Sequence, residues 1–250
     1  MQSEIARRLM LKYSPVAILF SNEKPQDALE FAEGRWGCVA AMLTAAMKGR
    51  RVVFSRKTFG CKGGGIGLGL VDEYADGFEY FISTGKEGAP PAAGMPEPEA
   101  YKKTPDLARE FMASMPLANI PEQYVVFAPL PEVDAAKGQP KVVVFYANPD
   151  QLSALVVLVN YSRSGFDNVL VPFAAGCQTV CLLPWNEAAR ECPRAVIGMT
   201  DITARPYMDA DLLSFSVPYA MFKEMEDNVP GSFLDKHDWK KVAERIRRNS

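Results

Sequence analysis

The sequence predicts an α+β protein in which a mixed β-sheet is packed by helices, with residues 1–250 forming a single domain. Segments with helical periodicity and segments rich in β-branched and aromatic residues are interleaved along the chain. Residues 124–128 (YVVFA) and 142–146 (VVVFY) are apolar at nearly every position, as expected for central strands covered on both faces. Strict alternation of strands and helices is absent, so a doubly wound α/β fold is the alternative.

The first half of the chain is expected to alternate between helices and strands. Residues 3–12 are amphipathic and predict a helix, and residues 38–48, which are small and apolar, predict a buried one. Strands are predicted where β-branched and aromatic residues gather, at 15–21, 51–59 and 78–83. Thr104, Pro105 and Asp106 predict another helix start, because threonine caps a helix and proline favours its first position.

The second half continues the same mixture. Residues 149–162 predict a helix, because one face carries the apolar residues Leu152, Leu155, Val156 and Val159. Further strands are predicted at 169–173, 179–183 and 195–199. Two helices are predicted near the end of the chain, at 219–227 and 238–248, the second with Trp239, Val242, Ala243 and Ile246 facing the core.

One segment predicts irregular structure. Residues 85–103 are rich in proline and glycine, which excludes a regular helix or a central strand. Such a segment is either a linker between two domains or a long functional loop over one domain. The composition does not change across it, so we expect a loop.

The composition excludes several classes of protein. The 28 basic and 30 acidic residues give a net charge of −2, so no nucleic-acid partner or anionic membrane is expected. The single histidine, His237, rules out a histidine-rich metal site within one chain. The chain has five cysteines, and its first residues lack the pattern of a secretory signal peptide. These two observations predict a cytoplasmic protein without a disulfide framework. The longest uncharged stretch, residues 168–186, contains prolines and a glycine and predicts buried structure rather than a membrane span.

The strongest local motif is the glycine-rich stretch TFGCKGGGIGLGL at residues 58–70. It matches neither the dinucleotide-binding spacing nor the P-loop spacing, and a tight turn leading into a close-packed helix would also explain its glycines. Cys61 lies inside it, next to Lys62 and to glycines whose N–H groups can face an anion. This setting predicts a lowered pKa for the Cys61 thiol.

Two other cysteines are candidates for the same site. Cys38 begins the predicted helix 38–48, where a thiolate gains from the free N–H groups, although a small core residue would look the same. Cys177 follows Gly176 at a predicted bend and could point into a cleft. Cys181 falls inside the predicted strand 179–183 and is expected in the core, and Cys192 is expected on the surface.

Five blocks of the sequence carry a family resemblance: GCVAAMLTAAMKGRRVVFSRKTFGCKGGGIGLGL, YKKTPDLA, NPDQLSALVVLVNY, FAAGCQTVCLLPW and PRAVIGMTDITARPYMDADLLSFSVPYAMFKEME. They resemble the domain-of-unknown-function 169 family, also called ArCR, over nearly the whole chain. The resemblance implies one domain and family cysteines at Cys38, Cys61 and Cys177. It implies no activity, because none is firmly assigned to that family.

Three converging thiolates predict a soft-metal site, most naturally an iron–sulfur cluster for redox or Lewis-acid chemistry on a small molecule. Cys38, Cys61 and Cys177 would be the ligands, with Cys181 in reserve. The N–H groups of Gly63, Gly64 and Gly65 would face the bound group, and Arg205 could clamp a carboxylate or phosphate.

Two alternatives stay open. In the first, Cys61 is a metal-free nucleophile or redox thiol, and in the second the protein only binds a small molecule. Whether the protein is an enzyme is therefore left open, and a homodimer is the default expectation for its assembly.

Overall fold

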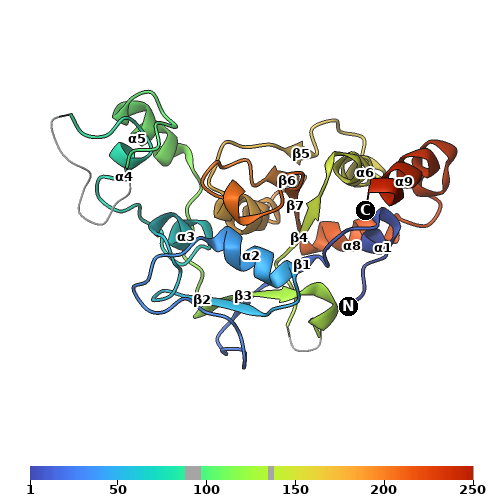
Figure 1. The fold of residues 1–250 in the computed structure, drawn as a ribbon, viewed down its shortest axis with the longest axis horizontal. Helices are drawn as coiled ribbons and strands as arrows, with labels where there is room; N and C mark the ends of the chain where they lie inside the picture. The colour runs from blue at the N-terminus through green and yellow to red at the C-terminus, as the bar shows by residue number, and fades with distance from the viewer. Residues whose placement is uncertain (88–96, 135–137, 250) are drawn as a thin grey trace.

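A computed structural model describes residues 1–87, 97–134 and 138–249. Within them, seven strands form one sheet in the order β2-β3-β1-β4-β7-β6-β5 (Figure 1). The strands are β1 (Val16–Ser21), β2 (Val52–Ser55), β3 (Tyr124–Pro129), β4 (Val142–Ala147), β5 (Val169–Leu170), β6 (Ala195–Gly198) and β7 (Leu213–Pro218). Only β5 and β6 pair in parallel, and every other neighbouring pair is antiparallel. The predicted α+β fold with a mixed sheet is confirmed.

Helices cover both faces of this sheet. They are α1 (Glu4–Leu9), α2 (Val39–Met47), α3 (Lys62–Gly67), α4 (Phe78–Phe81), α5 (Pro105–Ser114), α6 (Pro149–Asn160), the π-helical segment η2 (Gln178–Leu182) with α7 (Leu183–Glu187), α8 (Tyr219–Asp227) and α9 (His237–Asn249). No helix in the described parts of the chain has the length and apolar character needed to cross a membrane.

The side chains of β4 show how the two faces are divided. Val143 and Phe145 join a core formed with α1, α6, α8 and α9. Val142, Val144 and Tyr146 point the opposite way, into a core formed with α2 and η2. This period of two is the geometry of a strand buried on both faces. Figure 1 shows α1, α6, α8 and α9 together at one end of the molecule, α2 near its middle, and α3, α4 and α5 toward the other end.

The strand predicted at 78–83 is wrong, because this segment contains the short helix α4. Gly77 begins the helix with a φ of +79°, a conformation that glycine adopts without steric cost. The ring of Phe78 then packs against those of Tyr74 and Phe81. Local ring packing at helical spacing therefore accounts for the aromatic content that had indicated a strand.

The strand predicted at 179–183 is also wrong. The chain is helical from residue 176, becomes π-helical in η2 and continues into α7. All five residues of η2 are buried, and a short apolar run of this kind does not distinguish a buried strand from a buried helix. Pro184 follows η2 and has no N–H to donate, so a regular α-helix would lose a hydrogen bond at this point.

Three smaller differences concern strand extents and the predicted loop. Strand β7 is not predicted from the sequence, because Ser214 and Ser216 interrupt its apolar run, although both are fully buried. The strand predicted at 51–59 is shortened to β2. In the loop predicted at 85–103, residues 88–96 lie outside the described residues. Its last part lies against α4. The Glu99 N–H donates to the Phe81 carbonyl at 2.8 Å, and the Lys102 N–H donates to the Ile82 carbonyl at 2.9 Å.

Candidate functional site

The three predicted cysteines lie at the starts of three separate helices. Cys38 is the N-cap of α2, and Cys61 is the N-cap of α3. Cys177 lies in the first turn of the helix that continues through η2 into α7. Each sulfur therefore lies near the backbone N–H groups of a helix start, which do not all take part in regular helical hydrogen bonds.

Contacts between these helix starts bring the cysteines together. The Cys61 N–H donates to the carbonyl of Gly37, the residue before Cys38, at 3.0 Å. The Cys177 thiol donates to the carbonyl of Gly63, in the first turn of α3, at 3.2 Å. After burial, a negative charge on Cys61 is a further cause that raises the pKa of both Cys38 and Cys177. The structure thus unites the three cysteines that were predicted as ligands.

A glycine precedes each of these cysteines, and each glycine is required by close packing. A Cβ atom on Gly37 would lie 2.2 Å from the ring of Phe31. Gly60 has a φ of +82°, and a Cβ there would lie 2.4 Å from the Gly37 carbonyl oxygen. A Cβ on Gly176 would lie 2.8 Å from the sulfur of Met199. The repeated Gly-Cys pair was visible in the sequence and could have linked the three segments before the structure did.

The glycines of α3 divide into two kinds. A Cβ on Gly67 would lie 2.3 Å from the Cys177 sulfur, so this glycine allows α3 to approach η2 closely. Gly64 and Gly65 are also confined, with contacts at 2.6 Å to the Phe59 carbonyl and 3.0 Å to the side chain of Val71. For these three, close packing explains the residue type. Gly63 differs, because a Cβ there would meet only the edge of the Phe78 ring at 3.9 Å.

Burial controls the acidity of the three thiols. Burial raises the pKa of Cys38 and Cys61 above the usual thiol value and raises that of Cys177 well above it. Backbone N–H groups at each helix start oppose this effect, and for Cys61 the group is the N–H of Gly64, 3.2 Å from the sulfur. The lowered pKa predicted for Cys61 is therefore wrong: its glycine neighbours are present, but burial outweighs them.

Asp201 is a member of the site that the sequence analysis did not identify. Its carboxylate accepts a hydrogen bond from the Gly176 N–H at 3.0 Å, and two more from the backbone and hydroxyl of Thr203. The largest influences on the pKa of Cys61 are burial, which raises it, and backbone N–H groups, which lower it. The negative charge of Asp201 raises this pKa further, and it also raises the pKa values of Cys38 and Cys177. Its only signal in the sequence is its place just after the predicted strand 195–199.

Aromatic side chains border the site on the side of α4. The ring of Phe78 lies next to Gly63 and stacks obliquely on Tyr74, with ring centroids 5.2 Å apart. The Tyr74 hydroxyl accepts a hydrogen bond from the Gln178 side chain at 3.1 Å, which ties this aromatic pair to the residue after Cys177. Cys38 and Cys61 are half-buried, whereas Cys177 is 8% exposed.

Three other predicted positions have different surroundings from these three thiols. Cys181 is fully buried, and its sulfur faces the Leu68 carbonyl at 3.9 Å. Cys192 is exposed, as expected. Arg205 donates to the carbonyls of Ala210 and Leu212 at 2.6 Å each, so its guanidinium closes its own loop and does not face the cysteines.

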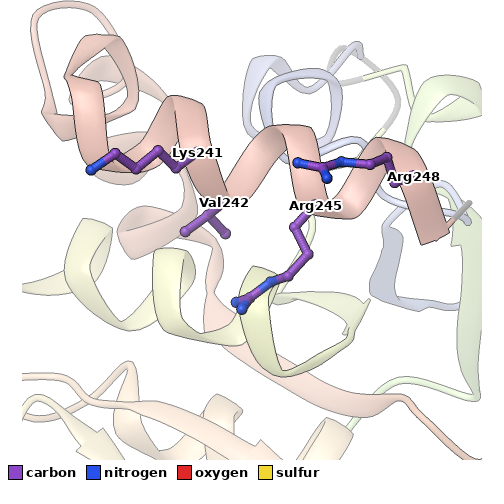
Figure 2. A pocket seen from close by; sticks show the side chains of 4 residues that line it. All are labelled: Lys241, Val242, Arg245 and Arg248. Atoms are coloured by element: carbon purple, nitrogen blue, oxygen red, sulfur yellow. The ribbon is translucent and has the colours of Figure 1, made fainter.

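A shallow pocket on α9 is also separate from the thiols. Figure 2 shows its lining of Lys241, Val242, Arg245 and Arg248 on one helix. Arg245 extends toward α6, where it pairs with Asp150, and Lys241 pairs with Asp238 on its own helix. This basic helix face is an exposed surface with ion pairs inside the protein.

The donor atoms do not form the site of a single metal ion as they are arranged here. In residues 1–87, 97–134 and 138–249, no group of three or more histidine, cysteine, aspartate or glutamate side chains could hold one metal ion. A four-iron, four-sulfide cluster imposes a different geometry, because each thiolate binds a different iron and the ligands are spread over the cluster. Three sulfur donors are also the chemistry that a cluster requires.

Comparison with known proteins gives one match. The family model described as DUF169, Uncharacterised ArCR, matches residues 4–228. No curated protein and no solved structure matches the chain.

Proposed function

Because the chain belongs to the domain-of-unknown-function 169 family (uncharacterised ArCR), we propose its function from the site itself: Cys38, Cys61 and Cys177 hold an iron–sulfur cluster. With three thiolate ligands, such a cluster has one iron open to a small molecule and would supply redox or Lewis-acid chemistry to it. The proposal agrees with the resemblance, which covers all three cysteines.

The observation that carries this proposal is the meeting of three thiols from three helix starts. Their sequence positions are 38, 61 and 177, so only the fold brings them together. A core has no need for three adjacent half-buried or buried thiols, whereas a soft metal centre needs them. The repeated glycine before each cysteine supports the same conclusion, because it allows the three chain segments to crowd around one point.

The surrounding backbone suits an anionic sulfur cluster. The N–H groups of Gly64, Ala40 and Gln178 each interact favourably with the thiolate form of the cysteine in their own helix. Hydrogen bonds to cluster sulfurs of this kind tune the reduction potential. Gly63 adds an open position beside Phe78, which would let a bound group approach the backbone of α3.

The thiols would lose their protons on binding the metal. Burial raises the pKa of all three, so without a metal they are protonated at neutral pH. Cluster binding replaces these protons with iron, and affinity should therefore increase with pH. The same raised pKa weakens the alternative in which Cys61 is a reactive thiolate, because a nucleophile needs a lowered value.

Anaerobic purification followed by iron and acid-labile sulfide analysis tests the proposal. We expect a brown protein with several iron atoms and a matching amount of sulfide per chain. Separate substitution of Cys38, Cys61 or Cys177 by serine should lower the iron content at least several-fold. Two matched controls, Cys192→Ser on the surface and Cys181→Ala in the core, should retain it. A colourless, iron-free protein after anoxic isolation would refute the proposal.

Three further predictions accompany this function. The small-molecule partner, the homodimer and the cytoplasmic location are all compatible with an oxygen-sensitive metal centre in a reducing compartment. Size-exclusion chromatography with light scattering would measure the assembly, and cell fractionation would measure the location.

A further inference from the structure

Cys38 and Cys61 lie at two helix starts that a backbone hydrogen bond joins, because the Cys61 N–H donates to the carbonyl of Gly37, the residue before Cys38. We propose that these two residues form an intramolecular disulfide when the site holds no metal and a small disulfide compound is present. The disulfide itself does not depend on the proposed cluster. Its regulatory consequence, given below, rests on the proposed function.

The backbone places the two residues within disulfide range. The Cys61 N–H donates to the Gly37 carbonyl at 3.0 Å, and this carbonyl belongs to the peptide unit that continues into Cys38. Standard peptide dimensions across this hydrogen bond hold the two Cα atoms within roughly 6.7 Å of each other. Disulfides span Cα separations of roughly 4.4–6.8 Å, so the backbone has no need to move far.

The side chains of this pair are also the accessible ones. Both Cys38 and Cys61 are half-buried, so a small oxidant can reach them. Each is the N-cap of its helix and has extended backbone angles, with φ of −92° and −81°. Their side chains thus lie outside the regular helices. Rotation about χ1 breaks no capping bond at Cys38, and at Cys61 it breaks only the capping bond from the Gly64 N–H to the sulfur.

The remaining cysteines are less suited to pairing. The Cys177 sulfur is confined by Gly67, where a Cβ would come within 2.3 Å of it, and its thiol donates to the Gly63 carbonyl. Cys181 is fully buried in the core, and Cys192 is exposed in a segment outside the site. The fold therefore favours the disulfide between Cys38 and Cys61 over any other, and the amounts of the different disulfides can be measured.

The reaction balances as two successive thiol–disulfide exchanges. One protein cysteine, through the minor fraction that is deprotonated because its pKa is raised, attacks the small disulfide as a thiolate; the S–S bond breaks and releases one small thiolate. The second protein thiolate then attacks the mixed disulfide, which forms the Cys38–Cys61 bond and releases the second small thiolate. The protein is oxidised by two electrons, the small disulfide is reduced to two thiols, and these thiols take up the two protons that the cysteines lose.

The consequence for the site follows from its ligand set. A disulfide consumes two of the three proposed ligands, so the oxidised chain cannot accept the cluster until it is reduced. The presence or absence of a small disulfide would thus control whether the site can be loaded.

The experiment uses the full-length protein, purified, freed of metal by a chelator and incubated with oxidised glutathione. Trypsin releases Cys38 in the peptide of residues 36–48 and Cys61 in that of residues 58–62, so mass spectrometry identifies their cross-link directly. We expect this linked peptide at least tenfold above any other linked pair, and reversal by dithiothreitol. Cys177→Ala should retain the link. Cys38→Ser and Cys61→Ser should each abolish it and leave a glutathione adduct on the remaining cysteine, with circular dichroism confirming that the variants are folded.

Two results would overturn the inference: stable glutathione adducts on both Cys38 and Cys61 without a link between them, or a dominant link that involves Cys177. Iron loading of the reduced and the oxidised protein separates the two proposals. If the reduced protein takes up no iron but the link forms, the proposed function fails and the disulfide stands. If iron binds and the link does not form, the disulfide fails and the proposed function stands.

Discussion

Gly67 makes the closest contact between α3 and the segment that carries Cys177, so its replacement by alanine tests how the site is built. The added Cβ would lie 2.3 Å from the Cys177 sulfur and 2.8 Å from both the Cys177 Cβ and the Gln178 backbone nitrogen. Rotation of one side chain cannot relieve a clash that includes backbone, so the two helices must separate. Overpacking of this kind costs about 1–3 kcal/mol.

The gain in helix propensity offsets part of this cost. Alanine is favoured over glycine inside a helix by about 0.5–1 kcal/mol. Setting these two contributions against each other gives a net loss in the free energy of unfolding between about 0 and 2.5 kcal/mol, centred on about 1 kcal/mol. For a chain of this length each 1 kcal/mol of this loss lowers the melting temperature by about 2–4 °C. In the protein with iron bound, the cluster content should fall as well, because Cys177 would be displaced from the other two thiols.

Gly63→Ala is the matched control in the same helix. Its added Cβ would meet only the Phe78 ring at 3.9 Å, an ordinary contact, and its backbone has no positive φ. The control should therefore be as stable as the wild type or more stable, by up to about 1 kcal/mol. Thermal and urea unfolding of the metal-free proteins would compare the two. Equal stability of Gly67→Ala and Gly63→Ala would show that the close approach of α3 to η2 has been misjudged.

Three further predictions concern other parts of the molecule. Glu226→Ala should lower the free energy of unfolding, measured in urea, by about 1–3 kcal/mol. The reason is that the Glu226 carboxylate on α8 accepts three hydrogen bonds from the residues at the start of α1. An unchanged free energy of unfolding would show that solvent replaces these hydrogen bonds. The hydrogen bond from Arg163 lowers the pKa of Glu224, so the stability that this bond contributes is present above the pKa of the unfolded state and is lost as pH falls through the pKa of the folded state. Glu224→Gln should therefore flatten this part of the curve of stability against pH. Identical curves at acid pH for the variant and the wild type would contradict the prediction. Iodoacetamide should modify Cys192 first and Cys181 last in the native protein, because Cys192 is exposed while burial raises the pKa of Cys181 to about 12. Peptide mass spectrometry measures the order of modification, and the reverse order would contradict the prediction.

Elements with a strong local signal were predicted well from the sequence. The helix α6 begins with Asn148 as its cap, followed by Pro149, and the structure shows a full capping box with Gln151 at this point. The strand β4 was predicted from its apolar run and lies in the middle of the sheet. In each case the residues that decide the structure are neighbours in the chain.

The two misassigned strands show where local patterns fail. The aromatic segment around Phe78 and the buried run in η2 carry strand-like residues, but both are helical. For η2 the deciding interactions come from elsewhere, since it packs against α3 on one side and the sheet on the other. Tertiary packing outweighed the weak preferences of single residues for strand or helix.

By itself, the sequence determined which cysteines are exceptional: Cys38, Cys61 and Cys177 each follow a glycine and each were expected near a turn or helix start. Only the tertiary structure decided that they meet, that Asp201 lies with them and that Cys181 faces the core instead. It also reversed the expected acidity of Cys61. The physical reason is that a thiol's pKa depends on how much water its surroundings exclude, and segments distant in the sequence set that exclusion when they pack.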